Sequence, residues 1–274
     1  MKVLIIGAAG FIGSTAAAHM IQNTDFSVVS IDDLSGTPDI FNLEPVLASR
    51  NRHTFYVADV FDQRIMNTIL KLEKPNVILF SYDSKIDHRD HTKAFGALLE
   101  TIYEGNNKVE KIVCILPDDG AIPENTSTFN NIVFVRPCRL FGHRQYPNNL
   151  VPTTIFRLLH EIEISPPKTN NVQEWLYIGD FLAAIILLIK SGTPKTYCVS
   201  AGFMATETEI INKLATTIGN CKIIEEGGSE MGNVSDIKDI LEEGWIPTRG
   251  LDESLSHTAR WYQTNEWAFR GAKW

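Results

Sequence analysis

Three glycines at fixed spacing constrain this chain more than any other feature of its sequence. A short apolar run over residues 3–6 leads directly into Gly7, and Gly10 and Gly13 follow before an alanine-rich stretch. A buried strand, a glycine turn and a helix in this order predict the start of a βαβ unit. Gly7 permits a tight turn, Gly10 lets backbone N–H groups approach a phosphate, and Gly13 allows the helix to pack closely on the strand. The pattern predicts that a dinucleotide binds at this turn.

A carboxylate at the end of the next predicted strand favours NAD over NADP. Asp32 follows the apolar run 26–31 and lies 19 positions after Gly13, where it can accept hydrogen bonds from both hydroxyls of the adenosine ribose. The 2′-phosphate of NADP would face this negative charge, which disfavours NADP. Further predicted cofactor contacts lie at the start of the first helix and after the second, third and fourth strands: Phe11, Ile12, Asp33, Asp59, Val60 and Ser81. Asp59 has two interpretations, a hydrogen bond to the adenine amino group or a helix cap.

Strands and helices alternate along the first half of the chain. Predicted strands cover residues 3–6, 26–31, 53–57, 77–80, 111–116 and 132–135, with helices over 14–22, 62–72 and 92–103 between them. This order predicts an α/β fold, a Rossmann doubly wound parallel sheet with right-handed crossovers. Beyond residue 152 the pattern loosens into helices over 153–161, 178–190, 207–218, 235–241 and 251–262 and a strand over 196–199. We therefore expect an NAD-binding domain over 1–150 and a smaller lobe over 151–274.

The composition excludes several classes of function. The 274 residues include 25 Lys+Arg and 33 Asp+Glu, a formal net charge of −8, so nucleic acid and anionic membrane surfaces are poor partners. Four separated cysteines show neither zinc nor redox spacing. No apolar run is long enough to span a bilayer, and the first residues do not form a secretory signal. We expect a cytoplasmic protein without a metal site, in which His88 and His91 are surface histidines.

Several segments together resemble the extended short-chain dehydrogenase/reductase family, and within it the nucleotide-sugar 4,6-dehydratases of dTDP-glucose 4,6-dehydratase type. The segments are the glycine turn, I-D-D-L at 31–34, A-D-V at 58–60, D-S-K-I-D at 83–87, I-L-P-D-D at 115–119, 136–142 followed by Y-P-x-x-L-V-P at 146–152, E-W-L-Y-I at 174–178 and W-Y at 261–262. The resemblance covers nearly the whole chain. It implies NAD as cofactor and a nucleotide-diphosphate sugar, of dTDP or UDP type, as the small-molecule partner.

The resemblance also implies roles for particular residues. Asp118 and Asp119 match the acid pair that carries out dehydration in the family, although Asp119 is one methylene shorter than the family's glutamate. A solvated loop is an equally good interpretation of two acids in this place. The implied substrate contacts are Ser84, Asn149, Leu150 and Gln173, and Gln173 stands where the family has an arginine. Trp175 and Tyr177 are expected to be core aromatics.

The family's catalytic tyrosine and lysine, spaced Tyr-x-x-x-Lys, have no counterpart here. The seven tyrosines, at 56, 82, 103, 146, 177, 197 and 262, are followed four residues later by Val, Ile, Asn, Leu, Phe, Ala and Glu. Between Asp119 and the predicted strand at 132, too few residues remain for an ordinary helix of about eleven residues with its loops. We expect the helix that carries this pair to be absent. The same helix forms half of the family's usual dimer contact, so the oligomeric state is left open.

Three functions are compatible with this sequence. The first is an NAD-binding, dehydratase-like protein with impaired catalysis, and the second is an active dehydratase or epimerase that uses Tyr82 and Lys85 as a displaced base with Asp118 and Asp119. A packing tyrosine beside a solvated lysine is the simpler interpretation of Tyr82 and Lys85, because a base at a new position needs its hydrogen-bond geometry established anew. The third is an NAD-sensing interaction protein whose sugar site is empty.

Overall fold

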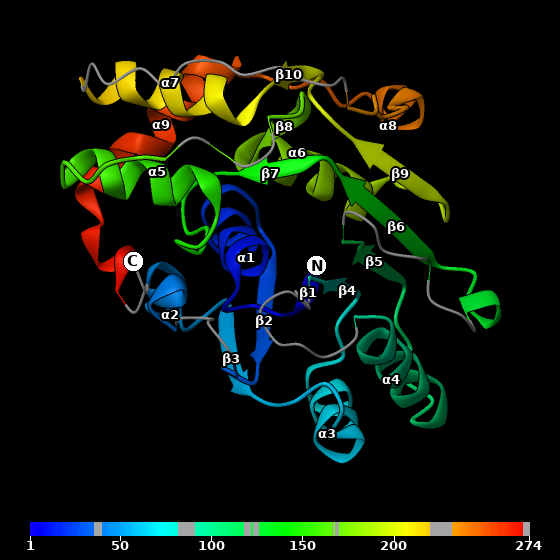
Figure 1. Ribbon diagram of the computed structural model, residues 1–274. Helices are drawn as coiled ribbons and strands as arrows, with labels where there is room; N and C mark the ends of the chain where they lie inside the picture. Colours follow the sequence, from blue (N-terminus) through cyan, green and yellow to red (C-terminus); the bar gives the residue numbers. More distant parts are fainter. Residues whose placement is uncertain are drawn as a thin grey trace. The chain divides into compact units, whose positions relative to one another are not determined.

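Seven strands form one sheet in the order β3-β2-β1-β4-β5-β6-β9 (Figure 1). The computed structural model describes residues 1–35, 40–81, 91–117, 122, 126–165, 167, 170–219 and 232–270. The strands are β1 (Lys2–Ile6), β2 (Ser27–Asp32), β3 (His53–Val57), β4 (Val77–Phe80), β5 (Lys111–Ile115), β6 (Ile132–Pro137) and β9 (Thr196–Val199). Each neighbouring pair from β3 to β6 is parallel. The predicted doubly wound sheet is therefore confirmed.

The sheet is buried on both faces because its central strands are apolar at successive positions. Leu4 and Ile6 lie in the same core cluster as buried side chains of α3 (Gln63–Glu73) and α4 (His91–Glu104). Val3 and Ile5 alternate with them and are also fully buried, as expected for a sheet covered on both sides. The helix α1 (Phe11–Asn23) lies on the other side of the sheet from α3 and α4 (Figure 1). The carboxyl ends of the parallel strands lie at one edge of the sheet, and doubly wound sheets bind their ligands at this edge.

The remaining helices follow the predicted stretches closely. They are α5 (Leu150–Leu159), α6 (Ile178–Lys190), α7 (Glu207–Ile218), α8 (Lys238–Glu242) and α9 (Leu251–Thr264), with three 3₁₀ helices, η1 (Ile40–Leu43), η2 (Thr126–Thr128) and η3 (Glu266–Phe269). One α-helix was not predicted, the single-turn α2 (Glu44–Leu47), which follows η1 directly. It is too short to show helical periodicity.

A second, three-stranded sheet also escaped the sequence patterns. It has the order β10-β8-β7, built from β7 (Arg139–Phe141), β8 (Gln173–Tyr177) and β10 (Phe203–Ala205). β7 and β10, with three residues each, are too short for a strand pattern to stand out from loop sequence, and β8 shows no alternation of apolar and polar residues. Trp175 and Tyr177 of β8 are 1% and 6% exposed, which confirms their assignment to the core.

The chain divides into two compact units at a boundary different from the predicted one. One unit contains Met1–Arg136 and Ala184–Tyr197, and the other contains Pro137–Ala183 and Cys198–Trp274. The predicted division at residue 150 misses the return of the chain to the first unit. The return occurs because β9 extends the large sheet beside β6, and the N–H of Phe134 donates to the carbonyl of Lys195 at 2.9 Å. Such a long-range pairing leaves no mark on local sequence patterns.

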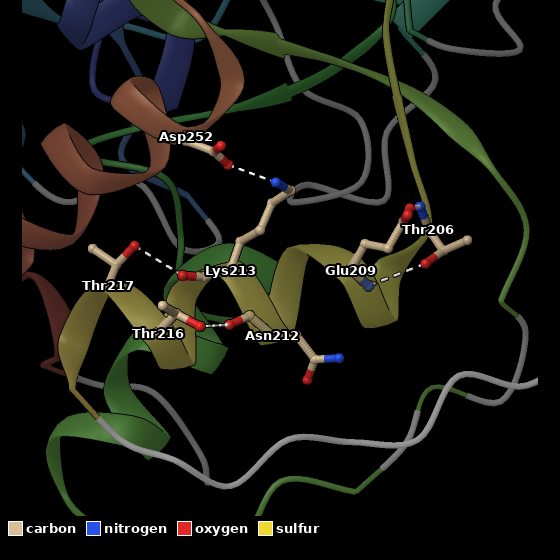
Figure 2. A network of polar contacts seen from close by, with 7 residues as sticks. All are labelled: Thr206, Glu209, Asn212, Lys213, Thr216, Thr217 and Asp252. Atoms are coloured by element: carbon tan, nitrogen blue, oxygen red, sulfur yellow. Dashed lines mark hydrogen bonds and ion pairs between the residues drawn. The ribbon is translucent and has the colours of Figure 1, made fainter.

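The helix α7 begins with a capping box (Figure 2). The Thr206 side chain accepts a hydrogen bond from the N–H of Glu209 at 3.0 Å, and the Glu209 carboxylate accepts one from the N–H of Thr206 at 2.6 Å. Further along the helix, Lys213 forms an ion pair with Asp252 of α9 at 2.7 Å (Figure 2), but both side chains are exposed, so this pair contributes little to stability. The capping box therefore contributes more to the stability of α7 than this exposed ion pair does.

We expect Thr206→Ala to lower the free energy of unfolding by about 1 kcal/mol, because it leaves the Glu209 N–H without its side-chain acceptor. Chemical denaturation measures this change. Thr217→Ala is the matched control: its hydroxyl donates to the Lys213 carbonyl inside the same helix (Figure 2), and its loss should change stability by less than about 0.5 kcal/mol. Equal effects of the two substitutions would show that the capping box does not determine where α7 begins.

Candidate functional site

The glycine turn between β1 and α1 has the backbone geometry that its sequence predicts. Gly7 has a φ of +76°, a conformation that side chains disfavour, and its N–H and that of Ala8 both donate to the Ile31 carbonyl at 3.1 Å. A Cβ at Gly13 would overlap the Gly7 carbonyl oxygen and lie 2.8 Å from the Ala8 Cα. At Gly10 a Cβ would meet the protein only at ordinary contact distance. Gly7 and Gly13 are therefore required by the protein's own packing, whereas Gly10 leaves space beside the turn.

The N-terminus of α1 is open to an anion. Gly10 is its N-cap residue, no side chain caps it, and its first turn carries no acidic residue. Phe11 and Ile12, both half-buried, occupy the first turn, where helix N–H groups have no intrahelical acceptor. These N–H groups and the helix dipole favour a phosphate at this position.

Asp32 closes the site at the end of β2. It is 6% exposed, its Oδ2 accepts a hydrogen bond from the Ala9 N–H at 2.8 Å and its Oδ1 accepts one from the Leu34 N–H at 2.9 Å. A carboxylate oxygen accepts more than one hydrogen bond. The two N–H groups thus hold the carboxylate against the glycine turn.

The neighbouring predicted contacts lie at the same edge of the sheet. The Asp33 Oδ1 accepts hydrogen bonds from the N–H and hydroxyl of Ser35, and the Asp59 Oδ1 accepts one from the Phe61 N–H at 3.0 Å. The helix cap considered for Asp59 is instead made by Asp62, whose side chain accepts from two N–H groups of α3. Binding of the adenine amino group by Asp59 stays a prediction.

Two further predicted contacts have structural tasks. The Val60 side chain is buried in the core cluster beside α3, so only its backbone can face a ligand. Ser81 follows β4 and donates its hydroxyl to the Ile6 carbonyl at 2.8 Å, which ties the ends of β4 and β1 together. A ligand contact by Ser81 would therefore use its hydroxyl oxygen as acceptor.

The sequence gives no signal for one residue at this site. Asn42, in η1, donates its side-chain amide to the Ala9 carbonyl at 3.0 Å. It lies ten residues after Asp32 in a stretch without regular periodicity, and only the folded chain brings it to the turn.

The predicted catalytic residues fall outside the described part of the chain. Asp118, Asp119, Tyr82 and Lys85, and the predicted substrate contact Ser84, belong to segments that follow β5 and β4. Sixteen residues separate Ile115 from Ile132, and the described ones among them contain only the 3₁₀ helix η2. Phe129 from this connection packs against the core cluster.

A tyrosine that acts as a base needs a lowered pKa, and three of the described tyrosines show the opposite. The hydrogen bond that Tyr56 donates to Glu73 raises its pKa to about 12, with burial adding to the shift. Burial raises the pKa of Tyr177 and, more strongly, of Tyr262. These three side chains are unsuited to accept a proton transfer from a hydroxyl at neutral pH.

The expectation of a surface histidine at 91 is wrong. His91 is the first residue of α4 and is 5% exposed, and its Nε2 lies 3.0 Å from the Ile115 carbonyl oxygen. Its ring also packs edge-on against Phe80. The first turn of α4 faces the strand ends, so the histidine is buried there. His88 lies outside the described residues.

The predicted substrate contacts in the second unit are only partly exposed to a ligand. Gln173 of β8 accepts a hydrogen bond from Arg139 at 2.5 Å, and Arg139 also pairs with Glu207 at 2.6 Å and covers the Trp175 ring. Asn149 is exposed, and its side-chain amide donates to the Tyr146 carbonyl at 3.0 Å. Leu150 follows it as the half-buried first residue of α5. The start of β7 and β8 therefore holds a guanidinium, although residue 173 itself is uncharged.

Comparison with known proteins agrees with this geometry. Residues 3–99 match the model of the NAD dependent epimerase/dehydratase family. The first third of the chain is thus similar to this family. A dTDP-D-glucose 4,6-dehydratase of Mus musculus is 23% identical over an alignment of 322 positions that covers 96% of this chain and 89% of the relative. Because the alignment is longer than the 274 residues here, the relative carries residues without a counterpart in this chain.

Solved structures share the fold across nearly the whole chain. A dTDP-glucose 4,6-dehydratase from Bacillus anthracis, solved in complex with NAD, has a TM-score of 0.86 at 20% identity and covers all of both chains. A UDP-glucose 4-epimerase from Thermotoga maritima, solved with UDP-glucose, has a TM-score of 0.78 at 20% identity and covers 97% of this chain and 100% of its own. These likenesses show the Rossmann fold of the chain.

Within the described ranges, no helix combines the length and apolar character needed to cross a membrane. Within the same ranges, no three metal-ligating side chains gather into a cluster.

Proposed function

We propose that this chain binds NAD at the glycine turn. The observation that carries the proposal is the buried Asp32 carboxylate held against the Ala9 N–H, beside an uncapped helix N-terminus. The turn would hold the pyrophosphate through the N–H groups of Phe11 and Ile12, and Asp32 would accept hydrogen bonds from the adenosine ribose. The NAD complex of the Bacillus anthracis dehydratase supports the same cofactor.

The proposed small-molecule partner is a nucleotide-diphosphate sugar of dTDP or UDP type. The names of the relatives support this class, since they include dTDP-glucose dehydratases and a UDP-glucose epimerase. Asn149, Leu150 and Gln173 would contact it, and Arg139 beside Gln173 would supply a positive charge.

We further propose that catalysis is impaired. Bound NAD would supply a hydride acceptor, but removal of the sugar hydroxyl proton needs a base, and no tyrosine in the chain is followed by a lysine four residues later. The raised pKa of Tyr56, Tyr177 and Tyr262 removes three other tyrosines as candidates.

The test separates binding from turnover. Purified chain is titrated with NAD by calorimetry and then incubated with NAD and either dTDP-glucose or UDP-glucose, with the 4-keto product measured by its absorbance in alkali. We expect NAD to bind and product to stay at the level of the protein-free blank. Product formation that is lost in Tyr82→Phe would instead identify an active enzyme with a displaced base.

A calorimetric titration with the same two nucleotide sugars tests the partner class. Measurable affinity for either one supports a retained sugar site. If NAD binds and neither sugar does, the chain is an NAD-binding protein whose sugar site is lost.

A further inference from the structure

Two adjacent peptide units of the glycine turn, one on each side of the Ala9 Cα, are held by side chains of other segments. Ala9 is fully buried, its N–H donates to Asp32 at 2.8 Å and its carbonyl accepts from Asn42 at 3.0 Å. A buried carbonyl without a partner is destabilising, and the Asn42 amide supplies a donor to this one.

The Ala9 carbonyl belongs to the same planar peptide as the N–H of Gly10. Gly10 is the N-cap residue of α1, its N–H points to the Gly7 carbonyl at 3.3 Å, and its own carbonyl accepts the N–H of Ser14. Fixing the Ala9 carbonyl therefore fixes the plane from which α1 starts, and with it the directions of the first free N–H groups of the helix.

The segment that presents Asn42 is well anchored. Leu43 and Val46, on η1 and α2, are both fully buried, and this segment packs against α1. The side-chain amide of Asn42 is thus held in place by a well-packed segment of the first unit. Its neighbour Phe41 is 53% exposed, so this segment also borders solvent beside the turn.

We propose that Asn42 is a positioning residue for the pyrophosphate of the dinucleotide, acting through the Ala9–Gly10 peptide. This inference rests on the proposed NAD binding. Asp32 would bind the ribose and fixes the preceding Ala8–Ala9 peptide, whereas Asn42 fixes the Ala9–Gly10 peptide. Loss of the Asn42 amide should lower the affinity for ligands whose phosphates contact the turn. Contacts at the ribose should stay largely intact.

The test compares Asn42→Ala with wild type for NAD and for adenosine, which lacks the pyrophosphate. We expect the affinity for NAD to fall about 5- to 10-fold, the range of one lost hydrogen bond, and the affinity for adenosine to change less than twofold. In the ligand-free protein, the amide NMR signals of Gly10 and Phe11 should shift. Asn23→Ala is the matched control, since Asn23 donates to the His19 carbonyl at the other end of α1.

The outcomes are distinguishable. Unchanged NAD affinity in Asn42→Ala overturns the inference, and so does an equal loss for NAD and adenosine, because that result indicates general loosening of the fold. If wild-type protein binds neither NAD nor adenosine, the proposed function itself is wrong and the inference falls with it.

Discussion

Asp32→Ala is expected to weaken NAD binding about 100-fold. Two charge-assisted hydrogen bonds to the ribose, each contributing at least about 1.5 kcal/mol, are lost together, and 1.4 kcal/mol corresponds to a tenfold change in affinity. The carboxylate is buried and already oriented by the N–H groups of Ala9 and Leu34, so it needs no reorganisation on binding. Isothermal titration calorimetry measures the change.

Two further variants make this experiment specific. Asp25→Ala removes the same charge from an exposed position and should leave NAD affinity unchanged. Asp32→Asn keeps the side-chain size and an acceptor but loses the charge. Its affinity for NAD should lie between that of wild type and that of Asp32→Ala. Wild-type affinity in Asp32→Ala would show that the ribose binds elsewhere.

Gly13→Ala is expected to have the largest effect on stability, a loss of about 3 kcal/mol, with NAD binding abolished in whatever folded protein remains. The added Cβ would overlap the Gly7 carbonyl oxygen, and its other near neighbours are also backbone atoms, at Ala8 Cα and Gly7 C. Backbone in a tight turn cannot rotate away as a side chain would, so α1 must move from the sheet. Urea denaturation measures the change in the free energy of unfolding.

Gly96→Ala is the control for this substitution. Gly96 lies within α4, and a Cβ there meets nothing within 4 Å. Since alanine favours helix over glycine by about 1 kcal/mol, this variant should be slightly more stable than wild type. If both glycine substitutions change stability equally, close packing at Gly13 is not what requires the glycine.

Local sequence predicts those parts of the fold whose determinants are local. The apolar runs of β3 and β4 and the periodic stretches of α6 and α7 begin and end where the patterns predict, because the apolar pattern and the end signals lie within each segment. The same holds for the glycine turn and Asp32, whose roles depend on a short spacing. By contrast, β7 and β10 carry too few residues to show a pattern, and β8 does not alternate between apolar and polar residues.

The sequence alone thus predicts the doubly wound sheet and the preference for NAD, and it shows the absence of Tyr-x-x-x-Lys. Each of these follows from residue types at fixed spacing. Only the tertiary structure decides that β9 returns to the large sheet, that His91 is buried at the strand ends and that Asn42 reaches Ala9. These three features depend on contacts between segments distant in sequence. Such contacts arise from packing of the whole sheet and its helices, which no local pattern records.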